Sequence, residues 1–221
     1  MARRKNFQRR NTILRNTFVL IKKNGINKVS LQMIADASEI SKSLLQSYYP
    51  HKQRLINDIV QQFLTKTLQV TLQLMNGEDN PFVATKVFVS MVLELAERDP
   101  EYGRLLDSLF SDFSAIDKWA QVLYEWLEDK QLLKNFGDAK RAQVGLDFAI
   151  AGCANLFTRR RELGITPDEI SDIMIVSFLS TFGDEKMAQI NDYFATSHQI
   201  IANMDMNEVQ KAADGLFLTE D

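Results

Sequence analysis

The pattern of hydrophobic and polar positions indicates helices from the start of the chain. Between residues 9 and 24, Leu14, Phe18 and Ile21 stand at positions i, i+4 and i+7, which places them on one face of a helix. The charged residues of this stretch fall on the other faces. Gly25 stands where a left-handed residue commonly ends a helix. The stretch therefore predicts an amphipathic helix that stops at Gly25.

A long helix is expected from residue 52 to about residue 75, because Leu55, Ile59 and Phe63 return every fourth residue. No segment shows the strict alternation of apolar and polar residues that a half-buried strand requires. The chain has only four prolines and nine glycines, a composition that suits long helices. We therefore predict an all-α fold.

Capping residues divide the second half of the chain into further helices. Asn80 precedes Pro81 and Thr166 precedes Pro167, so each pair joins an N-cap side chain to a proline at the first helical position. Glu169 completes a capping box with Thr166. These signals predict helices over residues 81–98, from residue 100, and over 116–133, 138–163 and 167–182, with one or two more between 184 and 215.

Two short helices are expected near the N-terminus, over residues 31–37 and 42–49. Ser30 and Ser41 can cap them, about three residues separate them, and Pro50 ends the second. This is the spacing of a helix-turn-helix unit, whose second helix lies in the major groove of DNA. The same spacing also occurs where two helices simply pack as a corner, so spacing alone leaves both interpretations open.

The charge distribution favours the DNA-binding interpretation. Residues 1–56 contain twelve Lys or Arg and two acidic residues, a net charge of +10, whereas the whole chain has a net charge of −3. The basic residues at positions 3–10 alone could form a solvated tail. Others lie inside the expected helices, at Arg15, Lys22, Lys23, Lys28, Lys42, Lys52 and Arg54. A basic part on an otherwise acidic protein is typical of binding to a polyanion.

Several classes of protein are not expected. The N-terminus has no apolar stretch of the kind found in a secretory signal, and no apolar run approaches the roughly 20 residues of a membrane span. The single cysteine, Cys153, permits no internal disulfide and fits a reducing compartment. We expect a cytoplasmic protein with no membrane partner.

Catalytic and metal chemistry is not expected either. His51 and His198 have no Cys or His neighbour at metal-ligand spacing, and capping explains the acidic residues Asp168 and Glu169. The basic run at 159–164 could hold an acidic ligand or simply favour the dipole of a helix C-terminus. No phosphate-binding loop, dinucleotide fingerprint or nucleophile elbow is present. We predict a protein that is not an enzyme and uses no cofactor or metal.

The N-terminal residues resemble those of TetR-type transcriptional regulators. The resemblance covers about residues 9–56 without a gap, and the family's pattern is matched in register by Ile13, Leu14, Phe18, Gly25, Ser30, Ile34, Ala35, Ile40, Ser41, Lys42, Leu45, Tyr48, Tyr49, Lys52 and Leu55. Four positions depart from the pattern. Ser38 replaces the usual Ala, Glu39 the turn Gly, Leu44 a Ser or Thr, and Gln46 a Tyr.

The resemblance implies an N-terminal three-helix helix-turn-helix DNA-binding domain over residues 1–56. It is joined to a larger helical effector-binding and dimerisation domain over residues 57–221. The resemblance further implies that two groups of residues contact DNA. Those that face bases are Gln32, Lys42, Ser43 and Gln46, and those that hold phosphates are Ser30, Ser47, Tyr48 and Lys52. A single recognition helix contacts few bases, so a homodimer on a palindromic double-stranded operator is expected.

The dimer interface is expected on the helices over 138–163 and 167–182, which pair with their mates in the family. A run of small residues on the first would allow close approach, and the second contributes apolar side chains. The expected interface residues are Gly145, Ala149, Gly152, Cys153, Ile173, Val176 and Phe178. The alternative is that both helices pack only within one subunit.

The larger domain is rich in aromatic and methionine side chains, which commonly form a core. Family members often keep a cavity there for an apolar effector. The expected ligand-binding residues are Phe63, Phe88, Met91, Phe110, Trp119 and Phe148. The resulting hypothesis is a regulator, most simply a repressor, that an unknown small, largely apolar effector releases from DNA. The alternative is a TetR-like protein that acts through a protein partner, with altered or lost operator binding.

Overall fold

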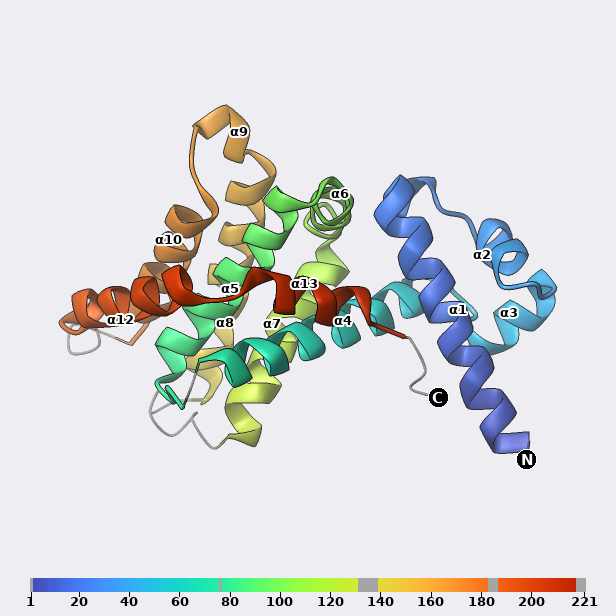
Figure 1. Ribbon diagram of the computed structural model, residues 1–221, viewed down its shortest axis with the longest axis horizontal. Helices are drawn as coiled ribbons and strands as arrows, with labels where there is room; N and C mark the ends of the chain where they lie inside the picture. The colour runs from blue at the N-terminus through green and yellow to red at the C-terminus, as the bar shows by residue number, and fades with distance from the viewer. Residues whose placement is uncertain (1, 76, 131–138, 183–186, 218–221) are drawn as a thin grey trace.

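The computed structural model describes residues 2–75, 77–130, 139–182 and 187–217, and for residues 2–6 only the backbone (Figure 1). Within these ranges the chain is built of helices and contains no strand, which confirms the predicted all-α fold. The predicted boundaries at 133 and 138 lie outside the described residues, and the helix expected to reach 182 ends at Ser180. No described helix is long and apolar enough to cross a membrane.

The first four helices form a small N-terminal head, drawn in blue and cyan in Figure 1. They are α1 (Ala2–Asn24), the 3₁₀ turn η1 (Ile26–Lys28), α2 (Leu31–Ala37) and α3 (Lys42–Tyr48), followed by the start of α4 (Lys52–Leu74). The predicted apolar face of α1 is buried, since Leu14, Phe18 and Ile21 are inaccessible to solvent. Gly25 has a φ of 80°, as expected of the residue that ends α1.

The rest of the chain forms a helical body around α5 (Pro81–Arg98), whose first thirteen residues are all buried. Its other helices are α6 (Pro100–Leu109), α7 (Phe113–Asp129), α8 (Ala139–Thr158), α9 (Arg160–Leu163) and α10 (Pro167–Ser180). Asn80 Oδ1 accepts from the backbone N–H of Phe82 at 2.9 Å, so the predicted cap of α5 is present. The capping box of Thr166 and Glu169 at α10 is also confirmed.

The C-terminal helices α12 (Ile190–Asn203) and α13 (Met206–Asp214) cross the body and return towards the head. In Figure 1 they run in red over α5 and α4 and end near α1. The ring of Phe217 lies 5.9 Å from that of Phe18, centroid to centroid, so the two ends of the chain share one apolar cluster. The head is therefore held by α4 and also by the C-terminal segment.

Candidate nucleic-acid interface and helical body

Helix α3 has one buried side and one exposed side. Ser41 accepts a hydrogen bond from the backbone N–H of Leu44 at 3.2 Å and so begins the helix. Leu45 is fully buried and anchors the inner side. The outer side carries Lys42, Ser43, Gln46 and Ser47, all of them exposed. A short helix with donors and small side chains on its outer face suits insertion into a DNA groove.

The other predicted DNA contacts are distributed around α3. Ser30 caps α2 by accepting from the N–H of Met33 at 3.2 Å, and it is exposed. Gln32 is exposed and donates to Asp36 at 2.7 Å, a bond it would have to give up to contact a base. Tyr48 is half-buried. The structure therefore brings these residues to the surface beside α3.

Lys52 has a structural task that the sequence did not indicate. Its ammonium donates to the carbonyls of Ile26 at 2.9 Å and of Val29 at 3.0 Å, and so fastens the start of α4 to the turn after α1. An ammonium has three donors, so two of them are already engaged. The predicted phosphate contact of Lys52 would use the third.

The turn between α2 and α3 contains a residue in an unfavourable backbone conformation. Glu39, at the position where the family pattern has Gly, has a φ of 53°. Left-handed backbone costs a residue with a Cβ about 1–2 kcal/mol, a cost that Gly avoids. The departure from the pattern therefore leaves the turn intact but strained.

The orientation of α3 is fixed by a group of three side chains. The Arg10 guanidinium donates to the Tyr49 hydroxyl at 3.0 Å and to Asp58 at 2.6 Å, and the hydroxyl donates to the same carboxylate at 3.1 Å. The bond to Asp58 raises the pKa of Arg10, and burial raises the pKa of Tyr49 to about 12. The group joins α1, the end of α3 and α4.

The basic face of the head is smaller than its net charge suggested. Lys22 was expected among the charges of that face but is buried, with its ammonium 3.0 Å from Asp214 of α13. This expectation is corrected, because an isolated ammonium loses its hydration on burial and needs a partner inside the protein. Exposed basic side chains remain at Arg9, Arg15, Lys23, Lys28, Lys42 and Arg54.

Five of the six predicted ligand-binding residues form part of the packed core. Phe63, Phe88, Met91, Phe110 and Trp119 are buried, and the Phe110 and Trp119 rings are stacked with centroids 4.9 Å apart. Phe148 does not join them, because 68% of its side chain is exposed on α8. The expectation for Phe148 is corrected: it belongs to the outer surface. Hollows of about 460 to 600 Å³ on the surface are lined by other residues.

The predicted dimer residues divide into two groups. Gly145, Ala149, Cys153 and Phe178 are buried within the subunit, and a Cβ on Gly145 would lie 3.2 Å from the Phe178 ring. For these four the expectation is corrected, because the small residues allow α8 to approach α10 of the same subunit. Gly152, Ile173 and Val176 are exposed, on the outer surface of the same two helices.

The outer surface of α8 and α10 is strongly apolar. Val144 is 58% exposed and adds to Phe148, Ile173 and Val176. Four large apolar side chains on two neighbouring helices are unusual on a free surface, and such patches mark interaction sites. Val144 and Phe148, which were not among the predicted interface residues, are the most exposed of the four.

A groove lies between α4 and α7, with a volume of about 600 Å³. We call it the α4–α7 groove. Its apolar wall consists of Leu68 and Leu72 of α4 and Val122 and Trp126 of α7. The volume lies within the roughly 300–1,000 Å³ typical of small-molecule sites.

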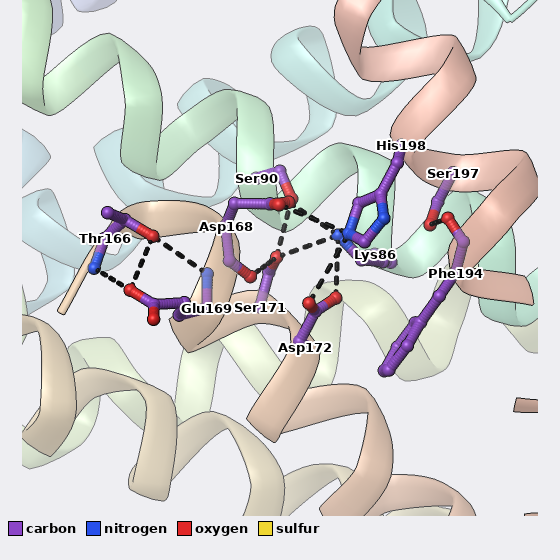
Figure 2. A network of polar contacts seen from close by, with 10 residues as sticks. All are labelled: Lys86, Ser90, Thr166, Asp168, Glu169, Ser171, Asp172, Phe194, Ser197 and His198. Carbon is purple, nitrogen blue, oxygen red and sulfur yellow. Dashed lines mark hydrogen bonds and ion pairs between the residues drawn. The ribbon is translucent and has the colours of Figure 1, made fainter. Parts of the chain in front are cut away.

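Figure 2 shows a polar cluster in the body that the sequence did not predict. The buried ammonium of Lys86 lies 2.7 Å from Asp168 and 3.0 Å from Asp172, and His198 lies 3.2 Å and 3.4 Å from the same two carboxylates. His198 therefore has acidic neighbours that sequence spacing could not reveal, because it comes from α12 and they come from α10. Although the two carboxylates and the imidazole could ligate a cation, the Lys86 ammonium already compensates the carboxylates.

The basic run at 159–164 has an internal partner. The Arg160 side chain is buried, bonded to Glu97, 3.0 Å from Asp107, and packed over the ring of Phe157. Arg160 thus joins α9 to α5 and α6, a role that neither interpretation of the run predicted. Arg159 and Arg161 remain exposed.

Comparison with solved structures relates the whole arrangement to known proteins. RolR in complex with resorcinol superposes with a TM-score of 0.59 and 14% identity, over 88% of this chain and 96% of that chain. RolR without ligand gives the same score and identity over 83% and 95%. A candidate TetR-family transcriptional regulator from Rhodococcus sp. gives a TM-score of 0.51 and 14% identity, over 80% and 99%.

No protein-family model and no curated protein matches the sequence. The similarity to the solved structures therefore lies in the path of the backbone and not in the sequence. At 14% identity, this similarity establishes the fold alone. The match extends over both the head and the body, since it covers at least 80% of the chain. The chain has the fold of TetR-type regulators, as its N-terminal motif predicted.

Proposed function

We propose that the protein is a transcription regulator that binds a palindromic double-stranded operator as a homodimer. The observation that carries the proposal is the exposed outer face of α3, with Lys42, Ser43, Gln46 and Ser47 presented above a buried Leu45. If α2 and α3 formed only a packing corner, the outer face of so short a helix would not need this combination of hydrogen-bond donors. The remaining exposed basic residues of the head supply attraction to the DNA backbone.

In this proposal base contacts and phosphate contacts have separate tasks. Gln46 can bond adenine bidentately, and each such pairing discriminates against a wrong base by about 1–3 kcal/mol. The cationic residues supply affinity that does not depend on sequence. If about six phosphates are neutralised, the logarithm of the binding constant falls with the logarithm of salt with a slope of about −5.

We further propose that the two subunits meet through the apolar outer surface of α8 and α10. That surface is supported by the exposure of Val144, Phe148, Ile173 and Val176 on two adjacent helices. A two-fold axis through this surface would place two heads at equal distances from it, as a palindromic operator requires.

Regulation by a small molecule is the last part of the proposal. RolR, which has the same fold, has been solved with resorcinol bound, and the body of the present chain has the α4–α7 groove of suitable size. An effector that displaces α4 would move the head, because α4 begins directly after α3. Operator release then follows from a changed distance between the two heads.

The decisive experiment is binding to DNA upstream of the protein's own gene, measured at 50 and 200 mM salt. We expect the binding constant to fall steeply between these two salt concentrations. Lys42→Ala should weaken binding to all sequences, whereas Gln46→Ala should lose discrimination between bases at one position of each half-site. Arg161→Ala, an exposed basic residue of the body, is the matched control and leaves binding unchanged. A protein that binds no DNA at 50 mM salt would contradict the proposal and favour the alternative of a protein partner.

A further inference from the structure

The seam between α4 and α7 contains polar groups without partners. The indole N–H groups of Trp119 and Trp126, both on α7, are shielded from solvent and have no acceptor among the described residues. An unpaired donor that is buried is costly, so each such group in a native protein needs an explanation. Trp119 is enclosed by Phe88 and Phe110, whereas Trp126 lines the α4–α7 groove.

The chemistry of the groove restricts what could occupy it. Its apolar wall favours an apolar body, and its rim on α4 carries the neutral side chains Gln61, Thr65 and Gln69. The rim on α7 carries the carboxylates of Glu125 and Asp129, and Lys130 follows directly after the helix, so the charged lining residues sum to −1. The net negative charge of the lining disfavours an anion, and the unpaired indole N–H calls for an acceptor.

From these features we infer that the α4–α7 groove binds a neutral, mainly apolar small molecule with a carbonyl or hydroxyl oxygen that accepts a hydrogen bond from Trp126. The inference rests on the proposed function to the extent that this molecule would be the effector. It differs from the sequence expectation, which placed the ligand among Phe63, Phe88 and Met91, now part of the packed core.

Binding at this groove is coupled to the head by shared side chains. Gln61, Thr65 and Gln69 line the α4–α7 groove and also a second hollow of about 460 Å³ whose wall includes Arg10 and Asp58. The Trp126 N–H is shielded, so an acceptor reaches it only when the ring turns or α4 and α7 move apart. Separation of the two helices would shift α4, which carries the Asp58 that holds Arg10 and Tyr49 beside α3.

The test is a titration of the full-length ¹⁵N-labelled protein followed by the indole N–H signals. The chain has two tryptophans, so two signals are expected and Trp119→Phe assigns them. The probes are acetophenone, its acceptor-free analogue ethylbenzene and its anionic analogue benzoate. We expect acetophenone to move the Trp126 signal downfield with a dissociation constant on the order of 1 mM, as befits a fragment. Ethylbenzene and benzoate should bind about tenfold more weakly, the effect of one hydrogen bond or one repulsion.

Two variants separate the groove from the rest of α7. Leu72→Trp fills the groove and should abolish the acetophenone shift, whereas Asp117→Asn, at an exposed residue of α7 that lines the neighbouring hollow between α7 and α8, should leave it unchanged. The inference is overturned if acetophenone at 10 mM leaves the Trp126 signal unmoved, if ethylbenzene moves it equally, or if Leu72→Trp still binds acetophenone. The titration contains no DNA, so failure of the proposed operator binding would not alter its result.

Discussion

The ammonium of Lys22 on α1 lies 3.0 Å from Oδ1 of Asp214 on α13, so the first and last helices of the described chain are joined directly. The same carboxylate oxygen accepts a hydrogen bond from the Tyr102 hydroxyl at 2.8 Å. The ammonium also lies 3.8 Å from the centroid of the Tyr102 ring. Burial and the bond to Asp214 raise the pKa of Tyr102, which keeps its hydroxyl a donor. The C-terminal helix thereby holds the head against the body.

Removal of that carboxylate should destabilise the protein. Asp214→Ala leaves the Lys22 ammonium buried and deprives the Tyr102 hydroxyl of its acceptor. Since Asp214 is half exposed, we expect a loss of only about 1–2 kcal/mol in the free energy of unfolding. Urea denaturation measures it. Glu208→Ala on the same helix, whose ion pair with Lys211 is exposed, is the matched control and should change stability by less than about 0.5 kcal/mol. Equal stability of the two variants would contradict the tether.

The turn before α3 allows strain and charge to be separated at one residue. Glu39→Gly removes both the left-handed strain and the negative charge, and should stabilise the protein by roughly 0.5–1 kcal/mol. Glu39→Gln removes the charge but keeps the strain, so its stability should match that of the parent protein. Thermal unfolding distinguishes them.

The same pair of variants tests the charge against DNA. Both should tighten operator binding by roughly threefold at 50 mM salt, because each removes a repulsive charge beside the phosphates, and the gain should shrink at 200 mM. A gain in Glu39→Gly alone would show that backbone strain, and not charge, limits binding.

Local rules predicted most of the helix boundaries and the helix-turn-helix unit, because caps and periodicity are properties of neighbouring residues. Ser41 begins α3 and the Thr166–Glu169 box begins α10, as predicted. Contacts between distant segments were not predictable in this way. Lys22 looked like a surface charge until α13 placed Asp214 beside it, and His198 gained its acidic neighbours only through packing of α12 on α10.

The burial of residues on α8 was mispredicted for a related physical reason. Small residues on α8 predict the close approach of another helix, but they do not distinguish a helix of a partner subunit from one of the same subunit. Gly145 allows α8 to reach Phe178 and Thr181 of its own chain. Only the fold could show that Phe148, three positions further along, lies outside this contact and is exposed.

The Lys86 cluster predicts another stability effect. The Lys86 side chain is 1% exposed, and the charge of its ammonium is compensated by Asp168 and Asp172. Lys86→Met leaves two carboxylates without the ammonium that compensates them, and should cost about 1–3 kcal/mol, reduced from a fully buried case because Asp168 is half exposed. Lys211→Met, at an exposed lysine, is the control for loss of charge alone. Unchanged urea unfolding in Lys86→Met would contradict the structural role.

Cys153 should be unreactive in the folded protein. Burial raises the pKa of its thiol to about 12, because a thiolate loses its hydration there, so the reactive form is scarce at pH 8. A chromogenic disulfide reagent at pH 8 should label the native protein negligibly and one thiol per chain in guanidinium, as the chain has a single cysteine. Thr158→Cys in a Cys153→Ala background, exposed on the same helix, should react within minutes. Rapid labelling of native Cys153 would show that α8 opens.

The apolar outer surface of α8 and α10 gives the most direct test of the dimer. Phe148→Glu places a charge on an exposed side chain, so the fold of the subunit should be unaffected, but a subunit interface would have to bury that charge twice around a two-fold axis. We expect the variant to sediment as a monomer and its operator affinity to fall by at least about 100-fold. Phe113→Glu provides the control, since Phe113 is 86% exposed at the start of α7, away from that surface. If both variants sediment as dimers, the subunits meet elsewhere.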